Sequence, residues 1–140
     1  MIHSKRIGTK LSTLLIPVML LLIPAFGSAH HGWGGYNDDV DSRFTLTELR
    51  LGNSHDHLTA VDGDGKEWDL VLATPTRNRN QGFNEESLSV GDEIDLLGRL
   101  HPSKAEIKVH CIYMEEEVIY TYYDWDGTTS LSKHSDRDQC

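Results

Sequence analysis

Short runs in which apolar and polar residues alternate recur along the chain from Arg43 to Tyr122. The apolar residues fall at every second position, which is the period of a β-strand with one buried face. Turn residues separate the runs, and the clearest turn signal is Asp62-Gly63-Asp64-Gly65. A chain with this pattern buries its apolar positions by forming a sheet that closes on itself or packs against a second sheet. The pattern therefore predicts an all-β fold.

We expect five or six strands and one short helical segment. The expected strands cover residues 43–51, 57–62, 66–72, 93–100, 107–113 and 118–122. The first run slips out of register at Thr47-Glu48, which predicts a β-bulge there. Thr74 and Pro75 are typical of a helix start and predict a turn or two of helix ending at Gly82. This order predicts a small OB-like barrel, with a small open sandwich as the alternative.

Residues 1–29 have the organisation of a secretion signal. Basic residues precede an apolar run from Leu11 to Phe26, and Gly27 and Ala29 occupy the small-residue positions that signal peptidase needs. The run is shorter than the roughly 20 residues that span a bilayer, and two prolines interrupt it. We therefore expect cleavage between Ala29 and His30 and a periplasmic or secreted product with no membrane anchor.

The remaining chain divides into three parts. Residues 30–43 form a Gly-rich and then acidic arm, in which Trp33 and Tyr36 are the apolar residues able to pin it to the body. Residues 44–123 form the barrel domain. Residues 124–140 are polar and are expected to form a loose tail.

The charge of the chain excludes several classes of partner. The formal net charge is -9 for 140 residues. Without residues 1–29, which hold three basic and no acidic residues, 10 basic residues remain against 22 acidic ones, a net charge of -12. Such a protein lacks the clustered Lys and Arg that nucleic acids and anionic lipid surfaces require. Acidity is compatible with solubility and with cations as partners.

The two cysteines, Cys111 and Cys140, leave their redox state open. In an oxidising compartment they can pair and tie the tail to the barrel. The alternative is one buried and one exposed thiol, because sequence alone supplies no geometry to decide between them.

Six short motifs occur in a fixed order between residues 29 and about 100. They are Ala29-His30-His31-Gly32-Trp33, Phe44-Thr45-Leu46, Asn53-Ser54-His55, Gly65-Lys66-Glu67-Trp68, Gly82-Phe83 and Leu88-Ser89-Val90-Gly91-Asp92. Their order resembles a family of small exported bacterial proteins whose activity is unknown. Ser54 and Val90 stand where that family has proline, and His57 stands where an apolar or aromatic residue is usual. The resemblance implies an exported β-domain, and it suggests His55 as a distant partner of the N-terminal histidines.

Two histidine clusters are the candidate metal ligands: His30-His31 at the expected new terminus, and His55 and His57 at the start of the second strand. After cleavage, the amine and ring of a terminal histidine can chelate one metal, and a further imidazole completes a three-nitrogen histidine brace. Copper suits such a site, because it favours tetragonal nitrogen ligation. Zinc is the second choice. We expect His30, His31 and His55 to converge, with His57 as an extra ligand or a supporting residue.

Simpler roles exist for the same histidines. Adjacent histidines at an exposed terminus bind metals adventitiously, and His55 and His57 can cap the strand or form hydrogen bonds at the barrel rim. We predict an exported barrel that binds a transition metal for buffering or delivery and not for catalysis. A redox enzyme that uses the same brace is a further alternative.

A different alternative is a barrel that binds a non-metal ligand or an envelope protein. Its surface would be an aromatic-rich stretch, whose rings are typical contact residues for carbohydrates and proteins. The stretch comprises Tyr113, Tyr120, Tyr122, Tyr123 and Trp125.

Overall fold

The computed structural model describes residues 32–131 and residue 140. The expected signal peptide therefore lies outside the described residues, as do His30 and His31. The elements are β1 (Asp38–Arg50), β2 (His57–Val61), β3 (Glu67–Val71), α1 (Pro75–Asn80), β4 (Glu93–Leu100), β5 (Glu106–Met114) and β6 (Glu117–Thr121). Within these residues, no helix is both long enough and apolar enough to cross a membrane.

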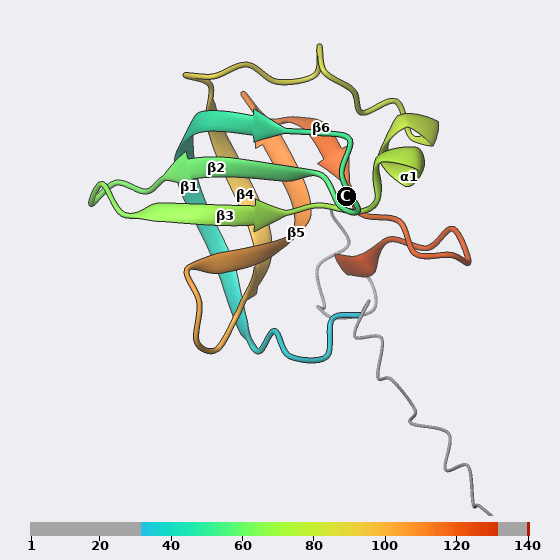
Figure 1. Ribbon diagram of the computed structural model, residues 1–140, viewed down its shortest axis with the longest axis horizontal. Helices are drawn as coiled ribbons and strands as arrows, with labels where there is room; N and C mark the ends of the chain where they lie inside the picture. Colours follow the sequence, from blue (N-terminus) through green and yellow to red (C-terminus); the bar gives the residue numbers. More distant parts are fainter. Residues whose placement is uncertain (1–31, 132–139) are drawn as a thin grey trace, which may run out of the picture.

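Five strands close into a barrel, and β6 is an additional strand on the edge of β5. The strand order is β3-β2-β1-β4-β5-β6, and a parallel pairing of β3 with β5 joins the two ends of the five-strand set (Figure 1). All other pairings are antiparallel. A meander of three strands closed by a parallel β3–β5 contact is an OB-like arrangement, so the predicted small all-β barrel is confirmed.

The barrel interior holds the alternating apolar residues that predicted the strands. Every strand of the closed barrel contributes to one continuous buried cluster, so the interior is a packed core. The largest fully buried side chains of this cluster are Leu46, Leu58, Leu70, Leu72, Ile94, Leu96, Ile107, Val109 and Ile112.

Two local features follow the sequence closely. The register of β1 against β2 shifts between Leu46 and Glu48, which confirms the predicted bulge. The hairpin between β2 and β3 turns on Asp62, whose carboxylate accepts hydrogen bonds from the Trp68 indole and from two turn amides. The hydrogen bond from Trp68, followed by those of the amides, lowers the pKa of Asp62.

The helix α1 is polar, yet one buried residue fixes it to the barrel. Thr74 is its N-cap without a side-chain hydrogen bond, and Pro75 opens the helix, as the sequence predicts. The amide of the buried Asn78 donates to Asp56 Oδ2 at 2.7 Å and to the Ala73 carbonyl at 3.0 Å. A buried amide with both partners in place holds the helix against the start of β2.

The two ends of the described chain are more ordered than the sequence indicates. β1 begins at Asp38 instead of Arg43, and it pairs with β4 from Asp38 onward. Three aspartates make residues 38–42 poor strand formers, but pairing with a neighbouring strand overrides propensity. At the other end, Ser130 and Leu131 are buried, so the segment expected as a loose tail packs on the barrel as far as Leu131.

A bulge in β5 changes which residues face outward. Gly98 pairs with Val109 and Leu97 pairs with Cys111, so His110 is the extra residue of a bulge. Val109 belongs to the barrel core, whereas Cys111 belongs to a second cluster with Leu97 and Leu131. The bulge therefore presents both His110 and Cys111 on the outer side of the barrel.

Gly98 permits this bulge because it has no side chain. A Cβ placed at Gly98 would lie 2.5 Å from the Lys108 carbonyl oxygen and 2.8 Å from Ile107 Cγ2. The β5 backbone therefore approaches β4 more closely here than any residue with a Cβ allows.

We predict that Gly98→Ala destabilises the protein by about 1–3 kcal/mol, because β5 must move or the bulge must be lost. The free energy of unfolding, measured by urea titration, tests this. The matched control is Gly63→Ala in the β2–β3 turn, where a Cβ meets nothing within 4 Å. Equal stabilities of the two variants would contradict the role of Gly98.

Candidate functional site

The structure places a buried aspartate between the two histidines of the second predicted cluster. Asp56, between them in sequence, is buried, and its carboxylate accepts from the Gly52 amide at 2.8 Å and from the Asn78 side chain. His55 and His57 are both partly exposed. Asp56 therefore faces away from His57, as the strand alternation predicts.

His57 is oriented by a carboxylate. Its Nδ1 lies 3.0 Å and 3.1 Å from the two oxygens of Asp69 on β3, and Arg50 donates to the same carboxylate at 2.9 Å. A carboxylate accepts hydrogen bonds, so the His57 tautomer that fits Asp69 has its proton on Nδ1 and its lone pair on Nε2. This is the arrangement that supports many histidine metal ligands.

A second polar cluster, which sequence reasoning missed, lies on the outer side of β5. Ile107 and Val109 point into the core, so Lys108 faces outward between them, and the bulge adds His110. Lys108 and His110 are nevertheless buried. Residues from the two ends of the described chain cover them. We call the whole group the β5 outer face, and it consists of Trp33, Tyr36, Lys108, His110, Tyr122 and Ser130.

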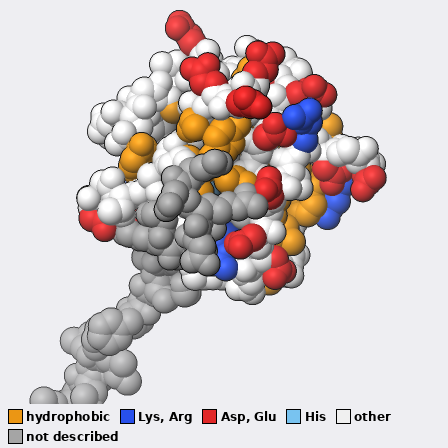
Figure 2. Space-filling view, turned by 180° about the vertical axis from the view of Figure 1, so that it is seen from behind, with side chains coloured by type: hydrophobic (Ala, Val, Ile, Leu, Met, Phe, Trp, Pro, Cys, Tyr) orange, Lys and Arg blue, Asp and Glu red, His pale blue; other side chains and the backbone are white. Residues whose placement is uncertain are grey.

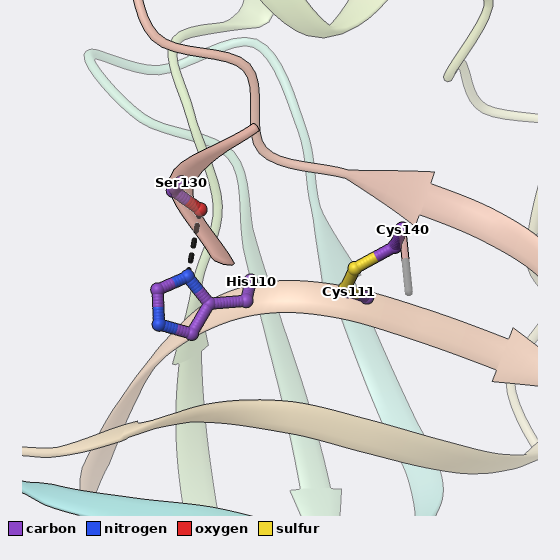
Figure 3. Close-up of a disulfide and its surroundings, with 4 residues drawn as sticks. All are labelled: His110, Cys111, Ser130 and Cys140. Carbon is purple, nitrogen blue, oxygen red and sulfur yellow. Dashed lines mark hydrogen bonds between the residues drawn. A yellow bond between two sulfur atoms is a disulfide. The ribbon is translucent and has the colours of Figure 1, made fainter. Parts of the chain in front are cut away.

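His110 joins these two ends. Its Nδ1 lies 2.7 Å from Ser130 Oγ, and Figure 3 shows this contact beside the cysteine pair. The ring of Trp33 stacks on the His110 ring with centroids 3.9 Å apart and planes at 8°. Tyr122 meets the same indole edge-on at 5.2 Å. One β5 side chain thus contacts a residue from the N-terminal arm and one from the C-terminal segment.

Lys108 fixes the arm through its ammonium group. Nζ donates to the Gly32 carbonyl at 3.2 Å and lies 5.3–5.7 Å from the ring centroids of Trp33, Tyr36 and Tyr122. Burial lowers the pKa of Lys108, and the nearby Asp124 carboxylate opposes that shift. The three rings offer their negative faces to the cation, which offsets part of the lost hydration.

Tyr36 attaches the arm at a second point. Its hydroxyl donates to the Glu106 carboxylate, and its ring meets His101 edge-on at 5.5 Å. Burial, and then this hydrogen bond, raises the pKa of Tyr36. The prediction that Trp33 and Tyr36 pin the arm is therefore confirmed.

The structure pairs Cys111 with Cys140, with Cα atoms 6.3 Å apart (Figure 3). This selects the disulfide from the two alternatives that the sequence left open. The bond joins the last residue to β5 next to His110, so the C-terminal segment is tied to the same outer face that holds the arm.

His57 lies on this side of the barrel too. It pairs with Val71 on β3, and Val71 pairs with Lys108 on β5. Paired residues project to the same face of a sheet, and neighbouring strands lie about 4.8 Å apart. The backbones of His57 and Lys108 are therefore separated by about 10 Å, with one strand between them.

The described residues contain no group of three or more His, Cys, Asp or Glu side chains close enough to hold a metal ion. His30 and His31 lie outside these residues, so their convergence with His55 and His57 stays a prediction. His110 had a sequence signal: it and Lys108 are polar residues inside a strand that is otherwise apolar after Glu106. Trp33 was predicted to pin the arm, but nothing in the sequence linked it or Ser130 to His110, because they come from distant segments.

No protein-family model matches the chain, and no curated protein matches it. The resemblance to small exported proteins therefore also stays a prediction.

We predict that Lys108→Met loosens the arm, because methionine fills the space but neither donates to Gly32 nor carries charge. The amide of Tyr36, which donates to the Trp33 carbonyl, should exchange with solvent about tenfold faster. Hydrogen-exchange NMR measures this rate. Lys66→Met is the control, since Lys66 lies over Trp68 at 3.8 Å in an exposed hairpin. Unchanged exchange in Lys108→Met would contradict the role of Lys108 in holding the arm.

We predict that Cys140→Ser lowers the free energy of unfolding by about 3–4 kcal/mol, because the bond closes a loop of 29 residues in the unfolded chain. Urea unfolding tests this, and wild-type protein under reducing conditions should match the variant. Thiol titration of the denatured wild type provides the independent check: two free thiols would show that the pair does not form.

Proposed function

We propose that this protein is an exported β-barrel that binds a transition-metal ion through the histidines at its processed N-terminus. Copper is the favoured metal and zinc the second choice. The observation that carries the proposal is the attachment of Gly32 and Trp33 to the β5 outer face by Lys108 and His110. Gly32 and Trp33 follow directly after His30-His31 in the chain.

The attachment limits where a processed terminus can reach. Cleavage after Ala29 makes His30 the first residue, two positions before Gly32. Two residues span at most about 7 Å. The new amine and both imidazoles would therefore start from a fixed point on the barrel, which lowers the ordering cost that a free terminal chelator incurs on binding metal.

His57 supplies a pre-oriented third imidazole. Its Nδ1 is held by Asp69, so Nε2 is the atom able to bind a metal. It lies on the same side of the barrel as Lys108, the residue that holds Gly32. His55, which the resemblance favours, is two residues away and partly exposed. Both histidines therefore belong in the test of the third ligand.

The chemistry of the donors favours copper. A free α-amine has a pKa of about 8, so its deprotonation costs little at neutral pH. An amine with two or three imidazoles forms the nitrogen set that Cu(II) prefers, and copper heads the affinity order of the divalent metals. Acidic side chains predominate over Lys and Arg on the rear face of the molecule, which raises the local concentration of cations (Figure 2). Binding, buffering or delivery of the metal is the role that these features support.

We predict that protein beginning at His30 binds Cu(II) at least about tenfold more tightly than the same chain with an acetylated N-terminus. Calorimetric titration against a competing chelator measures the affinities, and nitrogen hyperfine structure in the EPR spectrum reports the donors. Acetylation removes the amine as a ligand and leaves every side chain in place, so it separates the brace from adventitious histidine binding.

The third ligand is tested by His55→Ala and His57→Ala in the same processed protein. At least one should weaken Cu(II) binding about tenfold relative to the unsubstituted processed protein. Equal affinity for all of these forms and for the acetylated chain would show that the terminus binds copper without a built site.

A further inference from the structure

The side chain of Trp125 is almost entirely outside the protein. It is 90% exposed, against 64% for Val90 and 44% for Val118, the other exposed large hydrophobic residues of the described chain. Of the aromatic-rich stretch, Tyr120 and Tyr122 are buried and Tyr113 and Tyr123 are partly buried. The structure therefore reduces a general aromatic surface to one projecting indole.

The turn that carries Trp125 is fixed by its own hydrogen bonds. The Asp124 amide donates to the Thr128 carbonyl at 2.8 Å, and the Gly127 amide donates to the Asp124 carbonyl at 3.0 Å. Asp126 Oδ1 accepts from both the amide and the hydroxyl of Thr128, at 3.0 Å and 2.6 Å. None of these bonds uses the indole, so the turn does not need tryptophan at this position.

Arg77 on α1 covers one face of the indole. Its guanidinium carbon lies 4.0 Å from the ring centroid, and its Nη1 donates to the Tyr123 carbonyl at 3.1 Å. This bond ties the guanidinium, and with it α1, to the C-terminal segment that carries the indole. In the described chain no other residue makes a ring contact with Trp125, so its second face is available for stacking.

A pocket of about 310 Å³ adjoins this ring between α1 and the turn, which lie on the same side of the barrel (Figure 1). Its volume is at the small end of the range for ligand sites. Apart from Tyr123, Trp125 and Gly127, each residue that lines the pocket carries a hydroxyl, amide, carboxylate or guanidinium group. The lining residues that carry these groups are Thr74, Thr76, Arg77, Asn80, Gln81 and Asp124.

We propose that this pocket binds one pyranose ring of a neutral oligosaccharide. The C–H face of a pyranose carries partial positive charge and stacks on the negative face of an indole. The hydroxyls around the sugar rim each donate and accept, which matches amide side chains that do both, with the Asp124 carboxylate as acceptor and Arg77 as donor. The exported chain has 10 basic and 22 acidic residues, a net charge of -12 that repels polyanionic glycans, so the fitting glycan is uncharged.

The composition of the pocket favours a sugar over a protein partner. Protein-binding hot spots place an aromatic anchor inside a fully desolvated apolar surround. Here most of the residues around the indole carry hydrogen-bonding groups, and they lie on a partly exposed helix and an exposed turn. The site uses no histidine, so it is independent of the proposed metal site and its test does not depend on metal.

The test is NMR titration of the full exported chain with cellohexaose and chitohexaose, two neutral β-1,4-linked hexasaccharides. We expect saturable shifts of the Trp125 indole and of the Asn80 and Gln81 side-chain amides with at least one of them. Trp125→Ala should weaken that binding at least about tenfold, and Trp125→Phe should restore part of it. A hexameric alginate, which is polyanionic, should bind more weakly than the neutral sugar.

Two further variants test whether the sugar binds in this pocket. Val90→Ala removes an exposed apolar side chain from a different loop and should leave sugar binding unchanged. Asn80→Ala removes only a hydrogen-bonding group and should weaken it. Absence of saturable shifts with both hexasaccharides would overturn the proposal. Binding that Trp125→Ala leaves unchanged would do the same.

Discussion

The bulge at His110 is the constraint on which the outer surface of this barrel depends. A regular β5 would alternate inward and outward residues, and His110 and Cys111 could not both face out. Gly98 permits the close approach of β4 and β5 that accommodates the extra residue. With the bulge in place, one imidazole stacks on Trp33 and contacts Ser130, and the next residue forms the disulfide. A small change in strand register thus brings both ends of the described chain together.

This convergence gives the N-terminal arm a defined position. Lys108 is a buried cation held by a carbonyl and three aromatic rings, and burial of its charge is unfavourable unless those partners are present. The arm therefore supplies part of the environment that Lys108 requires, and Lys108 in turn holds the arm. The proposed chelator begins two residues before Gly32, so this mutual dependence fixes the point from which the chelator would extend.

The sequence predicted those features that depend on local periodicity and turn chemistry. The barrel was predicted from the alternation at Trp68 and Leu70 and from the turn at Asp62. The first bulge was predicted from the loss of alternation at Thr47. The strand at Asp38 was not predicted, because its formation depends on pairing with Leu100, which is far away in sequence. The β5 outer face escaped prediction for the same reason: His110 is 20 residues from Ser130, and Lys108 is 76 residues from Gly32. Long-range contacts of this kind leave no periodic signal in either segment.

The central claim is that export creates a ligand, because the amine of His30 exists only after cleavage behind Ala29. Intact mass analysis of the mature protein isolated from its native compartment tests this most directly. The account predicts a chain that begins at His30 with an unmodified amine and carries one disulfide. A mature chain that begins at any other residue, or whose amine is blocked, would contradict it.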